Sequence, residues 1–321
     1  MAKEEIKFCI GGAGGIPGKT VAESAALAER LGFDGLVFGG GIIGYGGHDP
    51  FILMAQAAAV TERLLFSTSV YLLPFNHPLV LAKQLATLDH LSKGRVIFGV
   101  GTGERARLHD IYGFPMSERG ARTDEYIEIL KGVWTQSPYR YQGKFFRFGE
   151  MPQEPTYQKP HIPIWVGGRV GGVEFGPDGK RRFKSRTAAI RRAARYGDGW
   201  LPYFTVPEEY KATVQMVKDS AREYGRENHP MTWAFHCFMV VKDSYDEALE
   251  SATKHQTFGG GSPEFSRRFD FIGTPQDCIK RLQEYVDVGV RHFNIQRPLV
   301  APEEFPHQLE RIAKEVLPAF R

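Results

Sequence analysis

The sequence has few of the features that mark exported, membrane-spanning or metal-binding proteins. Its three cysteines, Cys9, Cys237 and Cys278, are odd in number and far apart, with no C-x-x-C pair and no zinc-ligand spacing. About eighteen apolar residues never run together, as a membrane-spanning helix would require. Glu4 and Glu5 stand where a secretory signal would enter its apolar core. These absences predict a cytoplasmic protein without disulfides, a metal site or a membrane anchor.

The chain also lacks a large charge and the common hydrolytic motifs. The 41 Lys and Arg nearly balance the 37 Asp and Glu, so the net charge of +4 does not call for a nucleic-acid partner. A 42% hydrophobic and 24% charged composition is typical of globular proteins and excludes long disordered or coiled-coil segments. There is no G-x-S-x-G and no H-E-x-x-H motif. We therefore expect the chemistry to belong to a bound cofactor.

What the sequence does contain is a regular alternation of short apolar runs and longer segments of helical period. Such alternation predicts repeated βα units around a parallel sheet. The expected strands are residues 6–10, 35–38, 64–70, 95–100, 164–166, 199–202, 232–241 and 292–296. The expected helices are residues 21–31, 50–61, 78–91, 117–134, 187–195, 207–224, 275–288 and 303–316. Eight of each favour the α/β class as a (β/α)8 TIM barrel, although an open doubly wound sheet would give similar periodicity.

Two stretches interrupt this alternation and predict loop insertions in a single domain over residues 1–321. Residues 139–150 predict a hairpin that turns at Gln142-Gly143. Residues 171–185 predict a second hairpin that turns at Pro177-Asp178-Gly179. The insertions thus fall near residues 136–160 and 170–185, and they account for the length beyond that of a plain barrel.

Glycine clusters follow four of the expected strands. They are residues 11–15, 39–41, 101–103 and 167–168. Active sites of TIM barrels lie at the C-terminal ends of the strands, and glycine there permits close backbone approach to a flat cofactor or a phosphate. Ordinary turns also need glycine. Four glycine clusters at the same end of one barrel nevertheless favour a binding function for that end.

Two of these clusters resemble nucleotide-binding motifs and fit them poorly. AGGIPGKT, residues 13–20, nearly matches a P-loop, but Pro17 lacks the N–H that such a loop directs at phosphate. GGGIIG, residues 39–44, fits G-x-G-x-x-G formally, yet the chain continues through Tyr45-Gly46-Gly47-His48 instead of opening into a helix. A nucleotide triphosphatase therefore remains a minor alternative.

Longer segments carry a family resemblance over most of the chain. They are residues 48–64 (HDPFILMAQAAAVTERL), 77–104, 112–135, 163–168 (PIWVGG), 193–202 (AARYGDGWLP) and 316–320 (VLPAF). With these motifs the chain resembles the bacterial luciferase-like superfamily, α/β barrels that use FMN or the deazaflavin coenzyme F420. The resemblance implies a cofactor at the C-terminal ends of the strands and says little about the substrate.

The resemblance also implies roles for individual residues. The family's non-prolyl cis peptide beneath the cofactor ring matches Ser69-Val70 here. In the sugar-phosphate dehydrogenases that use F420, a GTGE segment contacts the ring, and Gly101, Thr102, Gly103 and Glu104 match it letter for letter. Glu104 is the first catalytic candidate, because a carboxyl group partly withdrawn from water can hold a raised pKa and exchange a proton. An exposed loop acid is the alternative.

One departure concerns strand two, where those dehydrogenases carry an Asp-His pair and this chain has Gly39-Gly40-Gly41. This difference puts sugar-phosphate oxidation in doubt. His48 is the second catalytic candidate, as a possible substitute from the following loop. For Asp49, capping of the next helix is the simpler interpretation. His77, which precedes Pro78, is interpreted equally well as a structural residue and as a catalytic one.

Gly167, Gly168 and Arg169 resemble the family's binding place for the cofactor phosphate. The neighbouring insertion carries Lys180, Arg181, Arg182, Lys184 and Arg186. Such a basic hairpin would attract the polyglutamate tail of F420, although a charge run is also a common solvated surface.

The sequence thus predicts an F420-dependent oxidoreductase that passes a hydride between the deazaflavin and a small organic substrate. The alternative is an FMN-dependent monooxygenase that takes reduced flavin from a separate reductase, and a third possibility is a barrel that carries a flavin without turnover. The family resemblance also implies a homodimer. The loops expected to select the substrate contain aromatic residues but no legible substrate code.

Overall fold

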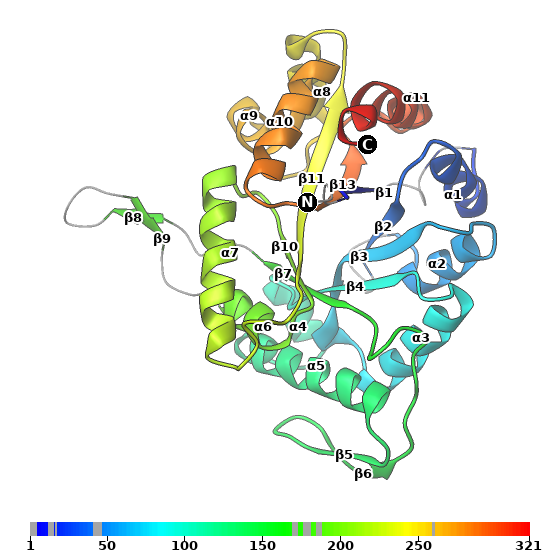
Figure 1. Ribbon diagram of the computed structural model, residues 1–321, viewed down its shortest axis with the longest axis vertical. Helices are drawn as coiled ribbons and strands as arrows, with labels where there is room; N and C mark the ends of the chain where they lie inside the picture. Colours follow the sequence, from blue (N-terminus) through cyan, green and yellow to red (C-terminus); the bar gives the residue numbers. More distant parts are fainter. Residues whose placement is uncertain are drawn as a thin grey trace.

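The computed structural model describes residues 5–11, 16, 18–40, 47–168, 173–175, 181–183, 188–258 and 261–321, the two three-residue pieces as backbone only. Eight parallel strands close into a barrel (Figure 1). They are β1 (Lys7–Gly11), β2 (Gly35–Gly40), β3 (Leu65–Leu72), β4 (Val96–Gly101), β7 (Ile164–Gly168), β10 (Gly199–Pro202), β11 (Thr232–Val241) and β13 (His292–Pro298). The barrel closes because β1 pairs with β13 and β10 pairs with β11. The TIM-barrel prediction is confirmed, with every expected strand in place.

Helices surround the barrel in the expected order. They are α1 (Val21–Arg30), α2 (Pro50–Ala58), α3 (Pro78–Leu91), α4 (Ala106–Ile111), α5 (Arg119–Thr135), α6 (Ala188–Tyr196), α7 (Pro207–Arg222), α8 (Tyr245–His255), α9 (Pro263–Phe269), α10 (Pro275–Asp287) and α11 (Phe305–Arg311). Asp49 caps α2 as predicted, because its Oδ1 accepts hydrogen bonds from the backbone N–H groups of Phe51 and Ile52. Thr20 and Thr274 cap α1 and α10 in the same way.

The sequence did not predict α4, α8, α9 or the short strand β12 (Phe271–Gly273). The last three form an additional unit between β11 and α10, where the repeating pattern expects a direct connection. β12 pairs with the end of β11 and lies outside the closed barrel. This addition places α9 and its phenylalanines beside the C-terminal end of the barrel.

Among the described residues, apolar side chains fill two layers of the barrel, and a third, small cluster of Leu72, Phe75, Leu108 and Phe114 lies at α4. The larger one lies between the strands and the helices and includes Phe8, Phe66 and Trp134. The smaller one lies inside the barrel, where Ile97, Trp165, Leu201 and Ala234 come from four different strands. The barrel is therefore a packed core and leaves functional chemistry to its ends.

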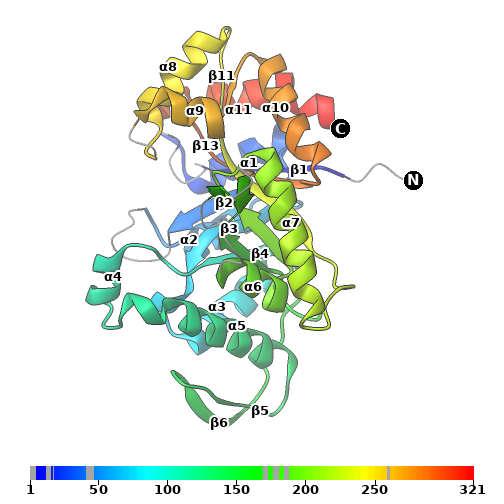
Figure 2. The ribbon, with the colours of Figure 1, turned by 90° about the vertical axis from the view of Figure 1, so that its left-hand side faces the viewer.

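Both predicted hairpins are present. β5 (Tyr139–Gln142) pairs with β6 (Arg147–Met151) in an antiparallel ribbon that projects from the barrel beyond α5 (Figures 1 and 2). The carboxylate of Glu125 on α5 accepts backbone hydrogen bonds from Lys144, Phe145 and Phe146 at the turn. β8 (Val173–Phe175) pairs with β9 (Arg181–Phe183) in the second hairpin, whose predicted turn lies outside the described residues.

Candidate active site

The C-terminal ends of the barrel strands meet on the side of the molecule where α4 lies (Figure 2). Four of the strands end here in the glycines that the sequence singled out, including Gly40, Gly101 and Gly168. Gly12 to Gly15 and Gly41 to Gly46 lie outside the described residues, as do Pro17, Arg169, Lys180, Lys184 and Arg186. The described part of the site therefore consists of the strand ends themselves.

The peptide bond between Ser69 and Val70 is cis, as the sequence predicted. It lies in β3, where the pairing with both neighbouring strands shifts register. The side chain of Val70 packs against glycines of β4 and β7, the next two strands around the barrel. A Cβ atom on Gly101 would lie 2.6 Å from Val70 Cγ2, and one on Gly167 would lie 2.7 Å from Val70 Cγ1. Both glycines are thus needed to seat Val70, which forms a small apolar platform at the site.

Polar side chains that sequence reasoning missed lie inside the barrel at the same end. His236 of β11 reaches across to Ser69, with 2.7 Å between Nδ1 and Oγ. Asn294 of β13 donates from Nδ2 to Ser67 Oγ over 3.0 Å. Within the described residues, Asn294 Oδ1 and Gln296 Oε1 are buried and have no hydrogen-bond partner. Buried acceptors without partners are rare, so these two oxygens point to a ligand or ordered water.

A signal for these residues was present in the sequence. His292, Asn294 and Gln296 alternate along one expected strand, and His236 and Phe238 alternate along another. Residues two apart in a strand share a face, and the inward face of a small barrel is normally apolar. Polar residues at such positions could therefore have been selected as site candidates.

His236 is neutral at physiological pH, because desolvation lowers its pKa to about 4. Its ring lies near those of Tyr203 and Phe238, with centroids 6.3 Å and 5.4 Å away. Nδ1 faces Ser69, whereas Nε2 has no hydrogen-bond partner in the described part of the chain. The ring is partly exposed, which leaves Nε2 available to a bound molecule.

Glu104 and His48 are both exposed in the structure. The expectation that the Glu104 carboxyl group is withdrawn from water is therefore wrong for this structure, because the segment after β4 runs along the surface before α4. Thr102 is partly exposed, whereas Gly103 is buried and accepts a hydrogen bond from His109 Nε2 over 3.3 Å. His77 caps α3 by accepting from the Leu79 N–H, which supports its structural reading.

Gly168 is the last residue of β7 and lies close to α6. A Cβ atom there would meet Ala189 Cβ at 2.6 Å and the Trp200 ring at 3.1 Å. Backbone at this point lies next to the first turn of α6, a location that suits a phosphate.

A set of aromatic side chains flanks the site beside His236, and all of them are at least partly exposed except Phe238, which is buried. We call it the aromatic wall, and it consists of Phe204 after β10, Phe238 of β11, Phe258 after α8, and Phe265 and Phe269 of α9. The ring of Phe204 lies 5.0 Å from that of Phe258 and 4.9 Å from that of Phe265. The backbone of Phe204 has a φ angle of 47°, which is rare for residues other than glycine. Phe258 is 46% exposed. An open apolar surface of this kind suits an apolar ligand.

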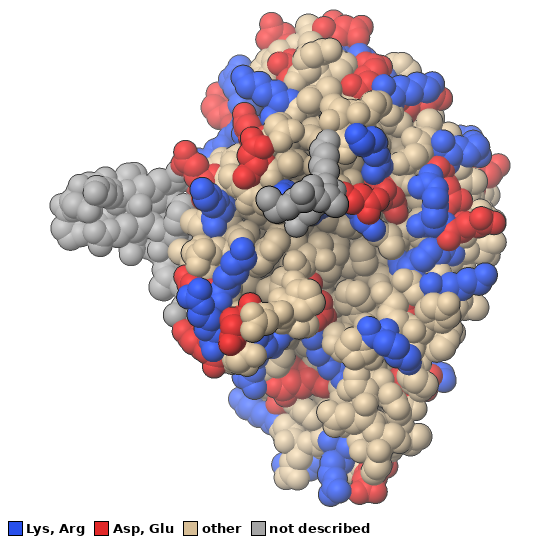
Figure 3. All heavy atoms as spheres, in the orientation of Figure 1, with Lys and Arg blue, Asp and Glu red and all other residues tan. Residues whose placement is uncertain are grey.

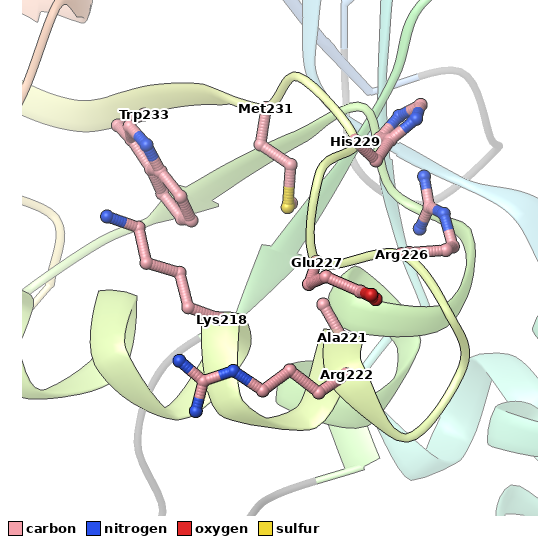
Figure 4. Close-up of a pocket in the computed structure, with 8 residues that line it drawn as sticks. All are labelled: Lys218, Ala221, Arg222, Arg226, Glu227, His229, Met231 and Trp233. Atoms are coloured by element: carbon pink, nitrogen blue, oxygen red, sulfur yellow. The ribbon is translucent and has the colours of Figure 1, made fainter.

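A hollow at the opposite end of the barrel is a weaker candidate. It lies between α7 and the start of β11 and is lined by Lys218, Ala221, Arg222, Arg226, Glu227, His229, Met231 and Trp233 (Figure 4). Arg222 pairs with Asp219, and Arg226 and His229 approach Asp198. These side chains already have an acidic partner, and active sites of TIM barrels lie at the other end of the strands.

In the described part of the chain, no three His, Cys, Asp or Glu side chains gather to hold a metal ion. None of the described helices combines the length and apolar content that crossing a bilayer requires.

The site therefore fits a flat ring that carries N–H groups. Val70 offers an apolar seat, and the orphaned oxygens of Asn294 and Gln296 are acceptors. The neutral His236 adds a group that exchanges protons.

Comparisons with known proteins show what the chain resembles. An uncharacterized protein of Mycobacterium tuberculosis is 35% identical over 184 residues, which are 57% of this chain and 59% of that relative's own length. An F420-dependent glucose-6-phosphate dehydrogenase of Kribbella flavida is 25% identical over 94% of both chains. An FMN complex of the oxygenating constituent of 3,6-diketocamphane monooxygenase from Pseudomonas putida superposes with a TM-score of 0.75 at 18% identity, over 98% of both chains.

The family described as luciferase-like monooxygenase matches residues 7–173 and 184–268. This match spans the glycine-rich strand ends, the cis peptide and the aromatic wall as far as α9. The chain belongs to the luciferase-like monooxygenase family.

Proposed function

We propose that the protein is an F420-dependent oxidoreductase that transfers a hydride between the deazaflavin and a small organic substrate. The observation that carries the proposal is the position of the Gly101 to Glu104 segment. This segment begins at the last residue of β4, where Gly101 packs directly against the Val70 side chain. The resemblance of this segment to F420-using dehydrogenases, and the match to such a dehydrogenase along 94% of both chains, support F420 over FMN.

Specific residues would hold the cofactor. Val70 would lie beneath the ring, and backbone groups of Gly101, Thr102 and Gly103 would line its edge. Gly167, Gly168 and Arg169 would receive the phosphate beside α6. Ser69 would hold His236 at the site, and Asn294 and Gln296 would accept hydrogen bonds from ring N–H groups. When bound, F420 supplies a carbon centre that accepts or releases a hydride.

Glu104 and His48 remain the candidates for catalysis that the sequence suggested. Both are exposed, so each would act only if a bound substrate or cofactor shielded it from water. Glu104→Gln removes the acid while keeping the shape of the side chain. It should lower turnover at least tenfold if Glu104 exchanges a proton.

Parallel equilibrium titrations with F420 and with FMN test the cofactor. We expect F420 to bind at least tenfold more tightly, followed by fluorescence of the deazaflavin and the flavin. Tighter binding of FMN would overturn the proposal. Binding of F420 with no redox change across a panel of alcohols, aldehydes and sugar phosphates would instead indicate a carrier without turnover.

The alternative is an FMN-dependent monooxygenase, because the family is described as a monooxygenase family and one structural neighbour is a monooxygenase in complex with FMN. This activity would need a separate reductase to supply reduced flavin. Incorporation of ¹⁸O from ¹⁸O2 into the product of a ketone, with chemically reduced FMN supplied, would distinguish it from hydride transfer, which adds no oxygen atom to the substrate.

We further propose that the whole chain works as one barrel unit in the cytoplasm and forms a homodimer. Its three cysteines are buried and free, as suits a reducing compartment. Exposed apolar side chains on α2 and α3 support the dimer and include Ile52 and Val80.

A further inference from the structure

The end of β2 offers no side chain that could exchange a proton. Its described residues after Phe38 are Gly39 and Gly40. On the described strand ends, His236 is a titratable side chain that reaches into the barrel and keeps one ring nitrogen without a hydrogen-bond partner. Glu104 and His48 are exposed, and His77 and Asp49 cap helices.

The surroundings of His236 define two different sides. Ser69 lies on the side of the cis peptide and of Val70. Phe238 and Tyr203 lie on the other side, and Phe238 leads into the aromatic wall through its stacked contact with Phe204, centroids 5.9 Å apart and planes 11° apart. A molecule that contacts Nε2 would therefore lie against phenylalanine rings.

We propose that His236 is the proton acceptor for substrate oxidation and that the substrate is an uncharged, apolar alcohol held by the aromatic wall, with the matching carbonyl compound as product. The proposal rests on the proposed function and names the substrate class and the base for that site. Ser69 is a positioning residue, because its hydroxyl group holds the imidazole through Nδ1.

The step balances with oxidised deazaflavin as the co-reactant. The alcohol O–H bond breaks and its proton goes to His236 Nε2. The C–H bond of the same carbon breaks, and its hydrogen leaves with the electron pair as a hydride to the cofactor. A C=O bond forms. The imidazolium then releases its proton to water, which its desolvated position favours.

The wall supports an apolar substrate in preference to a phosphorylated one. Cations next to it on α9 project to solvent or pair with acids, as Arg268 does with Glu209 over 3.4 Å. Arg297 at the end of β13 donates to the His255 carbonyl oxygen of α8 over 2.7 Å. A sugar phosphate would bring two negative charges to phenylalanine rings, at a large desolvation cost.

His236→Asn tests the base directly, because the Asn amide can still reach Ser69 while the position of Nε2 is lost. We expect kcat for benzyl alcohol or cyclohexanol to fall 10²- to 10⁴-fold, with the dissociation constant of F420 changed less than threefold. Added imidazole should restore part of the rate to His236→Ala. His307→Asn, on the exposed face of α11, is the matched control and should keep full activity.

Nuclear magnetic resonance of the protein without cofactor gives a readout independent of turnover. Adding cyclohexanol should shift the ¹⁵N resonance of His236 Nε2, and glucose 6-phosphate should not. Phe265→Ala should raise KM for benzyl alcohol at least fivefold with a smaller effect on kcat.

Two results would overturn the inference. One is full turnover by His236→Asn, and the other is a preference for glucose 6-phosphate over both alcohols. Neither affects the titration with F420, so failure of this inference is distinguishable from failure of the proposed cofactor. Failure of the unmodified protein to bind F420 would overturn both this inference and the proposed function.

Discussion

Val70 shows how single residues at neighbouring strands depend on one another. Its side chain occupies the space that Cβ atoms on Gly101 and Gly167 would need. The glycine clusters were interpreted from the sequence as room for a cofactor. The structure shows that two of these glycines first make room for the protein's own valine.

We expect Gly101→Ala and Gly167→Ala to displace Val70 and to weaken cofactor binding at least tenfold, with stability lowered by about 1–3 kcal/mol from overpacking. Gly149→Ala is the matched control, because a Cβ there meets no atom within 4 Å. Fluorescence titration and thermal unfolding measure the two effects. Unchanged F420 affinity in both site variants would contradict the role given to Val70.

Buried titratable residues make stability depend on pH. Burial lowers the pKa of His236 to about 4 and that of His292 to about 3, so the unfolded chain binds more protons below about pH 6.5. Stability from these residues is present above that pH and is lost as the pH falls. Asp270 acts in the opposite sense, because burial raises its pKa to about 6 and the folded state holds the extra proton.

Asp270→Asn should therefore steepen the loss of stability on acidification. Between about pH 6 and pH 4, we expect the variant to lose about 1 kcal/mol more per pH unit than the unmodified protein. Urea unfolding at half-unit steps of pH measures both slopes. Identical slopes would show that Asp270 titrates normally in the folded protein.

Residue roles were harder to predict than residue positions. The cis bond at Ser69-Val70 was predicted through the family resemblance and is present. The inward pair Ser69 and His236 was missed, because a contact between residues 167 apart in sequence follows from barrel closure and leaves no local pattern. The carboxyl group of Glu104 was expected to be shielded from water, but it is exposed. A sequence motif gives the order of residues along the chain and does not determine how far each side chain is exposed to solvent.

Elements were predicted well where their hydrophobic period was uninterrupted. All eight barrel strands and the helices between them follow from alternation, because each must bury one face against the next layer. α8, α9 and β12 were missed because they break the one-strand, one-helix repeat. Their omission mattered for function, since α9 supplies Phe265 and Phe269 to the aromatic wall.

The β5–β6 hairpin depends on a single carboxylate from α5. Glu125 accepts three consecutive backbone N–H groups at the turn. Glu125→Ala should leave these donors without a protein partner and expose the hairpin to hydrogen exchange, with global stability lowered by about 1–2 kcal/mol. Glu150→Ala, whose carboxylate lies on the exposed surface beside Arg140, serves as the control. Equal exchange rates at the turn in both variants would be evidence against the clamp.

At the scale of the whole molecule, Asp198 ties together the strands on one side of the barrel. It lies just before β10 and accepts a backbone hydrogen bond from Ile164 of β7 over 2.9 Å. Its other oxygen lies 2.9 Å from His229 Nε2 and 3.2 Å from Lys131 Nζ. Charges of both signs are otherwise intermixed on the face seen in Figure 3.

Asp198→Asn should destabilise the fold by about 3 kcal/mol, because Lys131 and Arg226 would keep their places around a neutral amide. Asp219→Asn, which removes an exposed pair with Arg222, should cost less than about 1 kcal/mol. Chemical denaturation compares them, and similar losses in both would show that Asp198 adds no more than a surface ion pair.

The proposed homodimer is also a property of the whole molecule. Ile52 is 71% exposed and Val80 is 55% exposed on two helices that pack against each other. Ile52→Glu combined with Val80→Glu should shift sedimentation from dimer to monomer without loss of the fold. A monomer in the unmodified protein at micromolar concentration would refute the dimer.

The pairing of β1 with β13 has a consequence during synthesis. The Cys9 thiol and the His292 ring, 283 residues apart in sequence, meet inside the finished barrel. At ribosomal speeds, β1 therefore waits on the order of tens of seconds before its second neighbour leaves the exit tunnel. Through that interval an unpaired, apolar strand edge is presented to the cell, so the yield of active protein should respond to the supply of chaperones more than to any single residue of the site.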